Sequence, residues 1–224
     1  MRVVGLLLAA GAGRRFGAPK ALVSSGGVPW VDRTCAVLDA AGCDPVVVVL
    51  GASAPEVRER ASLARRVVVD NPDWATGMGS SLRAGLAVLP GLGADAVVVL
   101  PVDTPGVTAA AVARLVALAS RTALARASYG GAPGHPVLIG ADHWAGAAAS
   151  ATGDAGARGY LRAHRALDVP CGDVADGADV DRPEDLPTAP DLPQPDLPRP
   201  DLPRPGPRGP GFSPRAAPPA ADPR

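Results

Sequence analysis

Residues Val3 to Lys20 read VVGLLLAAGAGRRFGAPK, and this stretch decides the fold. The run Val3–Leu8 is apolar throughout, as expected of a parallel strand that is covered on both faces. Glycines recur along the rest of the stretch, and they let backbone N–H groups turn toward a bound anion. Lys20 ends it and is the only lysine among the 22 Lys and Arg residues of the chain. The stretch therefore predicts a buried first strand followed by an anion-binding loop.

Two well-known glycine loops do not fit this stretch. A Walker A loop reads GxxxxGK[ST], whereas Lys20 stands three residues after Gly17 and is followed by Ala21. A dinucleotide fingerprint needs GxGxxG and an acidic residue at the end of the second strand. Here the third glycine comes one residue late, and the second expected strand ends in Leu50-Gly51. Neither class of loop is predicted.

The cations of the loop nevertheless suit a triphosphate. Arg14 and Arg15 supply planar guanidinium groups, and Lys20 supplies a flexible point charge. An ammonium can follow negative charge as it moves between phosphates during a reaction, which is a physical reason for lysine in an arginine-rich chain. The alternative from these residues alone is a surface lysine beside a structural turn.

Composition limits the class of protein. The chain has 224 residues, 47% of them hydrophobic, and no formal net charge, so nothing attracts it globally to nucleic acid or to an anionic membrane. Its three cysteines are odd in number and far apart, so they form neither a disulfide framework nor a CxxC metal site. This predicts reduced thiols in a cytoplasmic protein. The N-terminus is similar to a short signal peptide, but its brief apolar run reads better as a buried strand. A monomer or weak oligomer is expected.

Buried apolar runs alternate with helical patterns, which predicts an α/β fold with a mostly parallel sheet. The expected strands are Val3–Leu8, Asp44–Gly51, Arg65–Asn71, Ala94–Leu100, His135–Ile139 and Leu167–Val169. The expected helices are Pro29–Ala41, Ala54–Ala64, Ser80–Leu89, Thr108–Ala119, Asp142–Ala149 and Ala155–His164. Thr108, Ser80 and Ser81 are candidate N-caps.

The composition changes abruptly after Leu186, which divides the chain into a domain over 1–186 and a tail over 187–224. The tail contains the repeat PDLPQ, PDLPR, PDLPR between Pro190 and Arg204. Proline at this density removes backbone donors, so we expect a disordered, polyproline-like segment. It is interpreted as an inert extension, and a ligand for a domain that reads PxxP is the alternative.

Carboxylates follow the buried strands at two places. Asp103 comes just after the fourth strand, at the end of the sheet where open α/β folds bind ligands. The acidic run over 176–186 offers further carboxylates: Asp179, Asp181, Glu184 and Asp185. Mg²⁺ is usually held by one or two carboxylates together with substrate phosphates. The alternatives are a helix cap for Asp103 and a solvated turn for the acidic run.

These pieces together resemble the MobA-like nucleotidyltransferase family, and within it the molybdenum cofactor cytidylyltransferases. The resemblance rests on six blocks in register between Val3 and Leu186. They are LAAGAGRRFGAPK (8–20), NPDWATGMGSSLRAGL (71–86), PVDTP (101–105), GHPVLI (134–139), GDAGAR (153–158) and DVDRPEDL (179–186). Arg182 stands where the family has Thr, and the Pro-rich tail has no counterpart in the family.

The resemblance implies a three-layer, Rossmann-like sandwich of the GT-A type and a set of site residues. Lys20, Arg15 and Asp103 would be catalytic, and Asp103 and Asp181 would bind Mg²⁺. The nucleotide would contact Leu8, Ala9, Ala10, Gly11, Gly13, Arg14, Gly17, Lys20, Gly77, Met78, Gly79, Ser80 and Ser81. The acceptor side would include His135, Gly153, Asp154 and Arg158. Met78, but not Trp74, would approach the nucleotide. From the sequence alone, His135 reads as a packed or capping histidine rather than a catalytic one.

The implied reaction transfers CMP from CTP to the molybdopterin form of the molybdenum cofactor and releases pyrophosphate. Transient contact with a recipient molybdoenzyme is implied as well. Alternatives within the same fold are guanylyl transfer to this cofactor and nucleotidyl transfer to a sugar phosphate. Outside this class, the alternatives are an NAD(P)H-dependent oxidoreductase and a non-catalytic carrier of the finished cofactor. Ala9-Ala10-Gly11 is similar to the cytidylyl branch, since guanylyl members tend to have Ala-Gly-Gly there.

Overall fold

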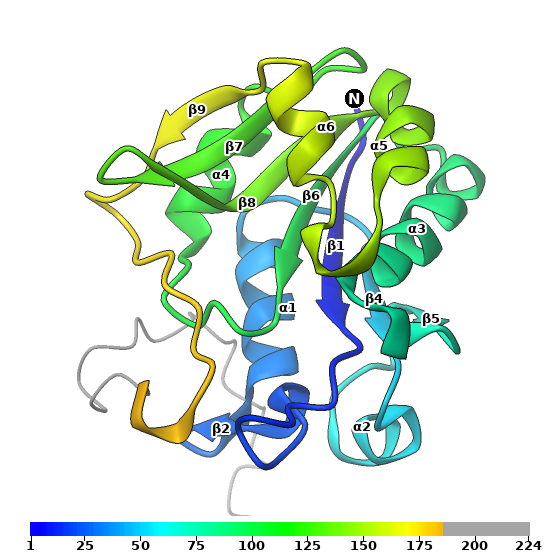
Figure 1. The fold of residues 1–224 in the computed structure, drawn as a ribbon, viewed down its shortest axis with the longest axis vertical. Helices are drawn as coiled ribbons and strands as arrows, with labels where there is room; N and C mark the ends of the chain where they lie inside the picture. Colours follow the sequence, from blue (N-terminus) through cyan, green and yellow to red (C-terminus); the bar gives the residue numbers. More distant parts are fainter. Residues whose placement is uncertain (186–224) are drawn as a thin grey trace, which may run out of the picture.

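A seven-stranded sheet forms the centre of the computed structural model, which describes residues 1–185 (Figure 1). Its strands are β1 (Val3–Ala9), β4 (Val46–Leu50), β5 (Val67–Asp70), β6 (Ala96–Pro101), β7 (Leu124–Tyr129), β8 (Ala132–Gly140) and β9 (Leu167–Pro170). A small ribbon of β2 (Ser24–Ser25) and β3 (Val28–Pro29) lies apart from it. The tail predicted over 187–224 lies outside the described residues.

The sheet has the order β5-β4-β1-β6-β8-β7-β9. Strands β5, β4, β1 and β6 are parallel neighbours, and β7 and β9 are parallel too, whereas β8 runs antiparallel to both β6 and β7. The chain leaves β1 toward β4 on one side and returns to β6 on the other. The carboxyl ends of β1 and β6 therefore flank the switch point of the sheet, where open α/β folds bind their ligands.

Helices cover both faces of the sheet. They are α1 (Trp30–Ala40), α2 (Ala54–Arg60), α3 (Met78–Val88), α4 (Ala109–Val116), α5 (Trp144–Ser150) and α6 (Arg158–Ala163). Residues of α1, α2 and α4 join one buried apolar cluster, and residues of α3, α5 and α6 join the cluster on the opposite face. Strands β1, β4 and β6 contribute to both clusters by alternation, so they are buried on both sides.

The predicted α/β sandwich with a mostly parallel sheet is confirmed, and every expected strand and helix is present with shifted ends. Strand β7 was not predicted, because its sequence LARASY lacks the β-branched residues that mark the other strands. Thr108 caps α4 as expected, since its hydroxyl accepts from the N–H of Ala111 at 3.3 Å. The caps predicted at Ser80 and Ser81 are wrong, because α3 already begins at Met78 after Gly77.

The three cysteines are buried and unpaired, as expected of thiols that serve packing. In the described part of the chain, no helix has the length and apolarity needed to cross a membrane.

Close packing of α3 on β1 depends on a glycine. A Cβ placed on Gly85 would lie 2.4 Å from Cδ1 of Leu6, which is fully buried in the sheet. The helix can approach the strand this closely only because the side chain is missing. The same helix begins at the cleft described below, so its position matters for the site.

Replacement of Gly85 by Ala should lower the free energy of unfolding by about 1 to 3 kcal/mol, because a methyl group is forced into a filled core. Gly91→Ala is the matched control, since a Cβ there would meet no atom within 4 Å. Urea unfolding of both purified variants measures the difference. Equal stability of the two variants would show that the core has room at this position.

Candidate active site

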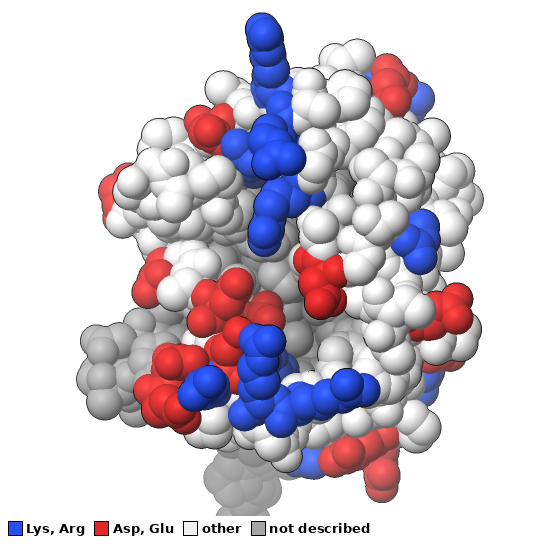
Figure 2. Space-filling model, in the orientation of Figure 1, with Lys and Arg blue, Asp and Glu red and all other residues white. Residues whose placement is uncertain are grey.

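An open cleft of about 580 Å³ lies at the carboxyl ends of β1 and β6. Figure 2 shows the hollow on this face, with acidic side chains inside it and basic side chains above and below. The lining includes most of the predicted site: Leu8, Ala10, Gly11, Gly13, Arg14, Arg15, Lys20, Gly77, Met78, Ser81, Asp103, His135, Asp154, Arg158 and Asp181. Segments far apart in the sequence therefore meet at one cleft, as the resemblance implied.

The loop after β1 is held by a tight turn at Gly13. Its φ is +61°, and a Cβ there would lie 1.8 Å from the carbonyl oxygen of Ala18, so only glycine fits. The N–H groups of Phe16 and Gly17 both donate to the Gly13 carbonyl at 2.9 Å. Gly17 therefore serves the turn and does not line the cleft, in contrast to its expected contact with the nucleotide.

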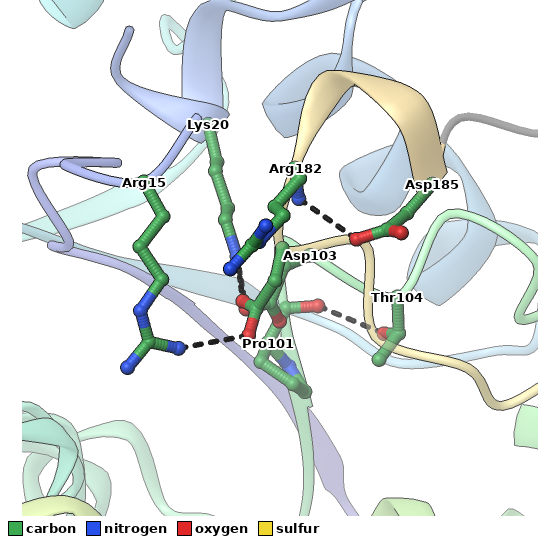
Figure 3. Close-up of polar contacts among 8 residues, drawn as sticks. Arg15, Lys20, Pro101, Asp103, Thr104, Arg182 and Asp185 are labelled. Carbon is green, nitrogen blue, oxygen red and sulfur yellow. Dashed lines mark hydrogen bonds and ion pairs between the residues drawn. The ribbon is translucent and has the colours of Figure 1, made fainter. Parts of the chain in front are cut away.

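Lys20 connects the two predicted metal-binding carboxylates. Its Nζ donates to Oδ2 of Asp103 at 3.1 Å and to Oδ1 of Asp181 at 2.6 Å (Figure 3). Arg15 donates to the other oxygen of Asp181 at 3.1 Å. The Lys20 side chain is 13% exposed, whereas Arg15 is 76% exposed at the rim. The loop after β1, the turn after β6 and the acidic segment thus meet at a single ammonium group.

The charges in this cluster support one another. Burial alone would lower the pKa of Lys20, but its hydrogen bond to Asp181 and the charge of Asp103 outweigh burial and raise it. The hydrogen bond from Lys20 in turn lowers the pKa of Asp181. Nearby, burial and then the charges of Asp103 and Asp181 raise the pKa of Asp179. Lys20 and Asp181 are therefore both charged at neutral pH.

Backbone hydrogen bonds fix the acidic segment against the turn after β6. The N–H of Val180 donates to the carbonyl of Asp103 at 2.8 Å, so Asp181 comes next to the cleft. After it, the N–H of Arg182 donates to Oδ2 of Asp185 at 3.0 Å, which closes the turn η6 (Pro183–Asp185) (Figure 3). The departure from the family pattern at Arg182 thus leaves Asp181 in contact with Lys20.

The start of α3 forms another wall of the cleft. Gly77 has φ +109°, and a Cβ there would lie 2.4 Å from the carbonyl carbon of Gly153, so the two backbones are in close contact. Asn71 lies beneath this wall, where its Nδ2 donates to the hydroxyl oxygens of Ser80 at 2.8 Å and Ser81 at 3.0 Å. Ser81 lines the cleft, whereas Ser80 is buried behind it.

Trp74 is a cleft residue that the sequence analysis did not place there. It lies in the turn η2 (Trp74–Thr76), and the guanidinium carbon of Arg14 lies 6.0 Å from the centre of its ring. A cation over an aromatic face is attractive, so Trp74 holds Arg14 beside the opening. The signal in the sequence was its position three residues before Gly77, within a block already assigned to the nucleotide.

Some predicted site residues do not line the cleft. Ala9, Gly17, Gly79, Ser80 and Gly153 lie behind or beside it and shape the backbone around it. Gly79, for example, lets α3 approach the backbone of Ala151, since a Cβ there would lie 2.8 Å from its carbonyl carbon.

The donor set fits a magnesium ion that is shared with phosphates. Asp103 and Asp181 converge on one cation, Lys20, so their oxygens already surround a position of positive charge. Among residues 1–185, no group of three or more His, Cys, Asp or Glu side chains could hold a metal alone. Two carboxylates and a substrate triphosphate are the usual environment of Mg²⁺.

His135 should remain neutral at pH 7, because burial lowers its pKa to about 4, with Asp103 opposing and Arg158 assisting the shift. In the unfolded chain the imidazole of His135 binds a proton below about pH 6.5, whereas in the native state it stays unprotonated until the pH is much lower. The free energy of unfolding should therefore fall between pH 6.5 and 4 in the wild type, relative to His135→Gln. Imidazole NMR of both proteins measures the midpoint, and a value near 6.5 would contradict the burial.

Comparison with known proteins identifies relatives of this chain. Residues 5–168 match the family described as MobA-like NTP transferase domain. Nicotine blue oxidoreductase of Paenarthrobacter nicotinovorans is 38% identical over 194 residues, which is 82% of this chain and 94% of that protein. Molybdenum cofactor guanylyltransferase of Rhodobacter capsulatus is 36% identical over 149 residues, which is 66% of this chain and 68% of that protein.

Solved structures show the same architecture. The crystal structure of an Rv0371c homologue from Mycobacterium sp. strain JC1 is 31% identical, with a TM-score of 0.70 over 83% of this chain and 94% of that one. The inositol-1-phosphate CTP transferase from T. maritima has a TM-score of 0.63 at 16% identity over 84% of this chain and 92% of that one, a likeness of fold alone. Because the family model covers most of the chain, this protein belongs to the MobA-like NTP transferase family of nucleotidyltransferases.

Proposed function

We propose that the protein transfers CMP from CTP to the molybdopterin form of the molybdenum cofactor and releases pyrophosphate. The observation that carries the proposal is the meeting of Lys20 and Arg15, from the glycine loop, with Asp103 and Asp181 across the cleft. Two cations and two carboxylates within hydrogen-bond distance suit a triphosphate with its metal ion. The guanylyltransferase relative acts in the same area of metabolism by its name, which supports the acceptor.

The proposed reaction is an in-line displacement. A phosphate oxygen of the acceptor attacks the α-phosphorus of CTP, a new P–O bond forms, and the bond to the bridging oxygen of the departing pyrophosphate breaks. A phosphate monoester is already nucleophilic at neutral pH, so the reaction needs no strong general base. A reaction without a general base is compatible with the lowered pKa of His135, which leaves this residue neutral at pH 7. Catalysis would come from positioning and from neutralised charge.

The charged groups that meet at Lys20 each have a place in this scheme. Lys20 and Arg15 would exchange their carboxylate partners for phosphate oxygens and hold the triphosphate over the loop. Asp103 and Asp181 would then be released to bind Mg²⁺, which supplies positive charge to the phosphates. Gly13 keeps the loop backbone in place, and Arg14 on Trp74 adds a cation at the rim.

Packing behind Ala10 supports a pyrimidine nucleotide. Ala10 lines the cleft, and a Cβ on Gly51 would lie 2.8 Å from the Ala10 Cβ and 2.6 Å from the Trp74 Cβ. Ala10 is therefore closely packed against Gly51 and cannot move back to make room for a larger base. A methyl group fixed at this place would crowd a purine more than a cytosine.

A single assay with different substrates distinguishes the proposed function from the alternatives. Molybdenum cofactor in its molybdopterin form is mixed with Mg²⁺ and either CTP or GTP, and pyrophosphate release is measured. Release that is faster with CTP is expected. Faster release with GTP, or release only with glucose 1-phosphate as the acceptor, would replace the proposal by another transferase. Oxidation of NAD(P)H with a dye acceptor and no release of pyrophosphate would indicate an oxidoreductase, and cofactor binding alone would indicate a carrier.

Lys20→Ala and Asp103→Ala should each lower turnover about 100-fold or more, because the first removes a positive charge beside the phosphates and the second removes a ligand of the proposed Mg²⁺. Steady-state pyrophosphate release measures the loss, and thermal unfolding confirms that each variant is folded. Arg60→Ala is the control, since within residues 1–185 Arg60 pairs only with Glu56, on the surface of α2. Turnover near the wild-type value in either folded variant would remove that residue from the mechanism.

A further inference from the structure

A smaller cavity opens off the cleft and continues it under α6. This side pocket has a volume of about 170 Å³ and shares Leu8, Met78, His135, Arg158 and Asp179 with the cleft. Sites for drug-sized ligands have volumes of about 300 to 1,000 Å³, so the side pocket can take a single ring system and little more. A molecule bound there would reach the cleft at its open end.

The side pocket has apolar walls. Its floor is formed by strand residues of the sheet, and helix residues of α3 and α6 cover it from the other side. The apolar lining is Leu8, Met78, Leu82, Val99, Pro133, Val137, Ile139 and Leu161. Such a slot favours a flat, conjugated ring over a hydroxylated sugar, because sugar hydroxyl groups would lose their hydrogen bonds to water there.

Arg126 breaks the apolar pattern of the floor. Four residues are register neighbours across β6, β8, β7 and β9: Val99, Val137, Arg126 and Asp168. This cross-strand row begins with two valines and ends in a charged pair. The Nε of Arg126 donates to Oδ1 of Asp168 at 2.6 Å, and its side chain is only 16% exposed. Within residues 1–185, its two terminal nitrogens have no hydrogen-bond partner. They remain as paired donors on the wall of the side pocket.

A purely structural role would be to fasten the edge strand β9 to β7 by a cross-strand ion pair. A structural ion pair elsewhere joins α4 to the turn after β9, where Arg114 binds Asp173 through both terminal nitrogens at 2.6 Å. Arg114 lines neither the cleft nor the side pocket. Arg126 differs because it uses one edge for Asp168 and keeps the other toward a cavity, which is how an arginine binds a ligand with two adjacent acceptors.

We infer that Arg126, positioned by Asp168, selects the acceptor substrate by binding the carbonyl-bearing edge of a flat heterocycle in the side pocket. The ring lies between the apolar walls, and the phosphate of the same molecule lies in the cleft near Arg158. The acceptor class is therefore a phosphorylated, conjugated heterocycle with a lactam edge, and not a sugar phosphate. This inference rests on the proposed function and names the residue that determines its acceptor.

The test is direct binding of neopterin 3′-monophosphate, a fluorescent pterin with one phosphate, to the full chain. Arg126→Met should weaken binding about tenfold to a hundredfold, as expected for loss of hydrogen bonds from a charged donor. Arg126→Lys should recover only part of the affinity, because an ammonium cannot form the paired contact. Arg114→Met is the matched control and should bind like the wild type. Transfer assays should show a raised KM for the acceptor with kcat within about threefold.

Parallel calorimetry with Mg²⁺ and CTP separates this inference from the proposed function. If CTP fails to bind while the pterin binds in an Arg126-dependent way, the proposed transfer reaction is refuted and the proposed pterin site is supported. Equal pterin affinity of Arg126→Met and wild type would overturn the inference, as would Arg126-dependent binding of glucose 1-phosphate in place of the pterin. Loss of thermal stability in both Arg126→Met and Asp168→Asn, with pterin affinity unchanged, would assign the pair to strand fastening alone.

Discussion

The contact of Lys20 with Asp103 and Asp181 is the interaction on which the site depends. It joins three segments that the sheet delivers separately: the loop after β1, the turn after β6 and the acidic segment near the end of the described chain. Without Lys20 between them, the negative charges of Asp103 and Asp181 would repel each other. The ammonium group of Lys20 offsets that repulsion, so the three segments can lie close together.

The sequence sufficed to predict the parts of the fold that follow from strong local signals. The runs that became β1, β4 and β6 are apolar throughout, and the loop between the first of them and Lys20 is rich in glycine. Because parallel strands bring their carboxyl ends to one edge, the order of blocks along the chain also placed Lys20 and Asp103 together. The assignment of Asp181 to the site followed from family resemblance, since its own neighbours read as a solvated turn, and its hydrogen bond to Lys20 was not predicted.

Other features could not be read from local patterns. Strand β7 is built from alternating small and polar residues, and its one clear signal was the Gly130–Gly131 hairpin turn after it. Arg126 looks like a surface residue in the sequence, because its burial depends on β8 and β9 pairing on either side of it. Gly17 shows the opposite case: it lies inside a recognised loop and its N–H closes the Gly13 turn, but it is not among the residues that line the cleft.

The ion pairs of the cleft have a thermodynamic consequence for the proposed reaction. In the proposed reaction, a divalent ion arriving alone would have to displace Lys20 from both carboxylates, and a triphosphate arriving alone would have to draw Lys20 and Arg15 away from them. Each ligand would perform part of the work that the other requires, so their affinities would be linked and each would strengthen the other by the same factor. In the proposed reaction, the protein would therefore favour the pair of metal ion and triphosphate over either component alone.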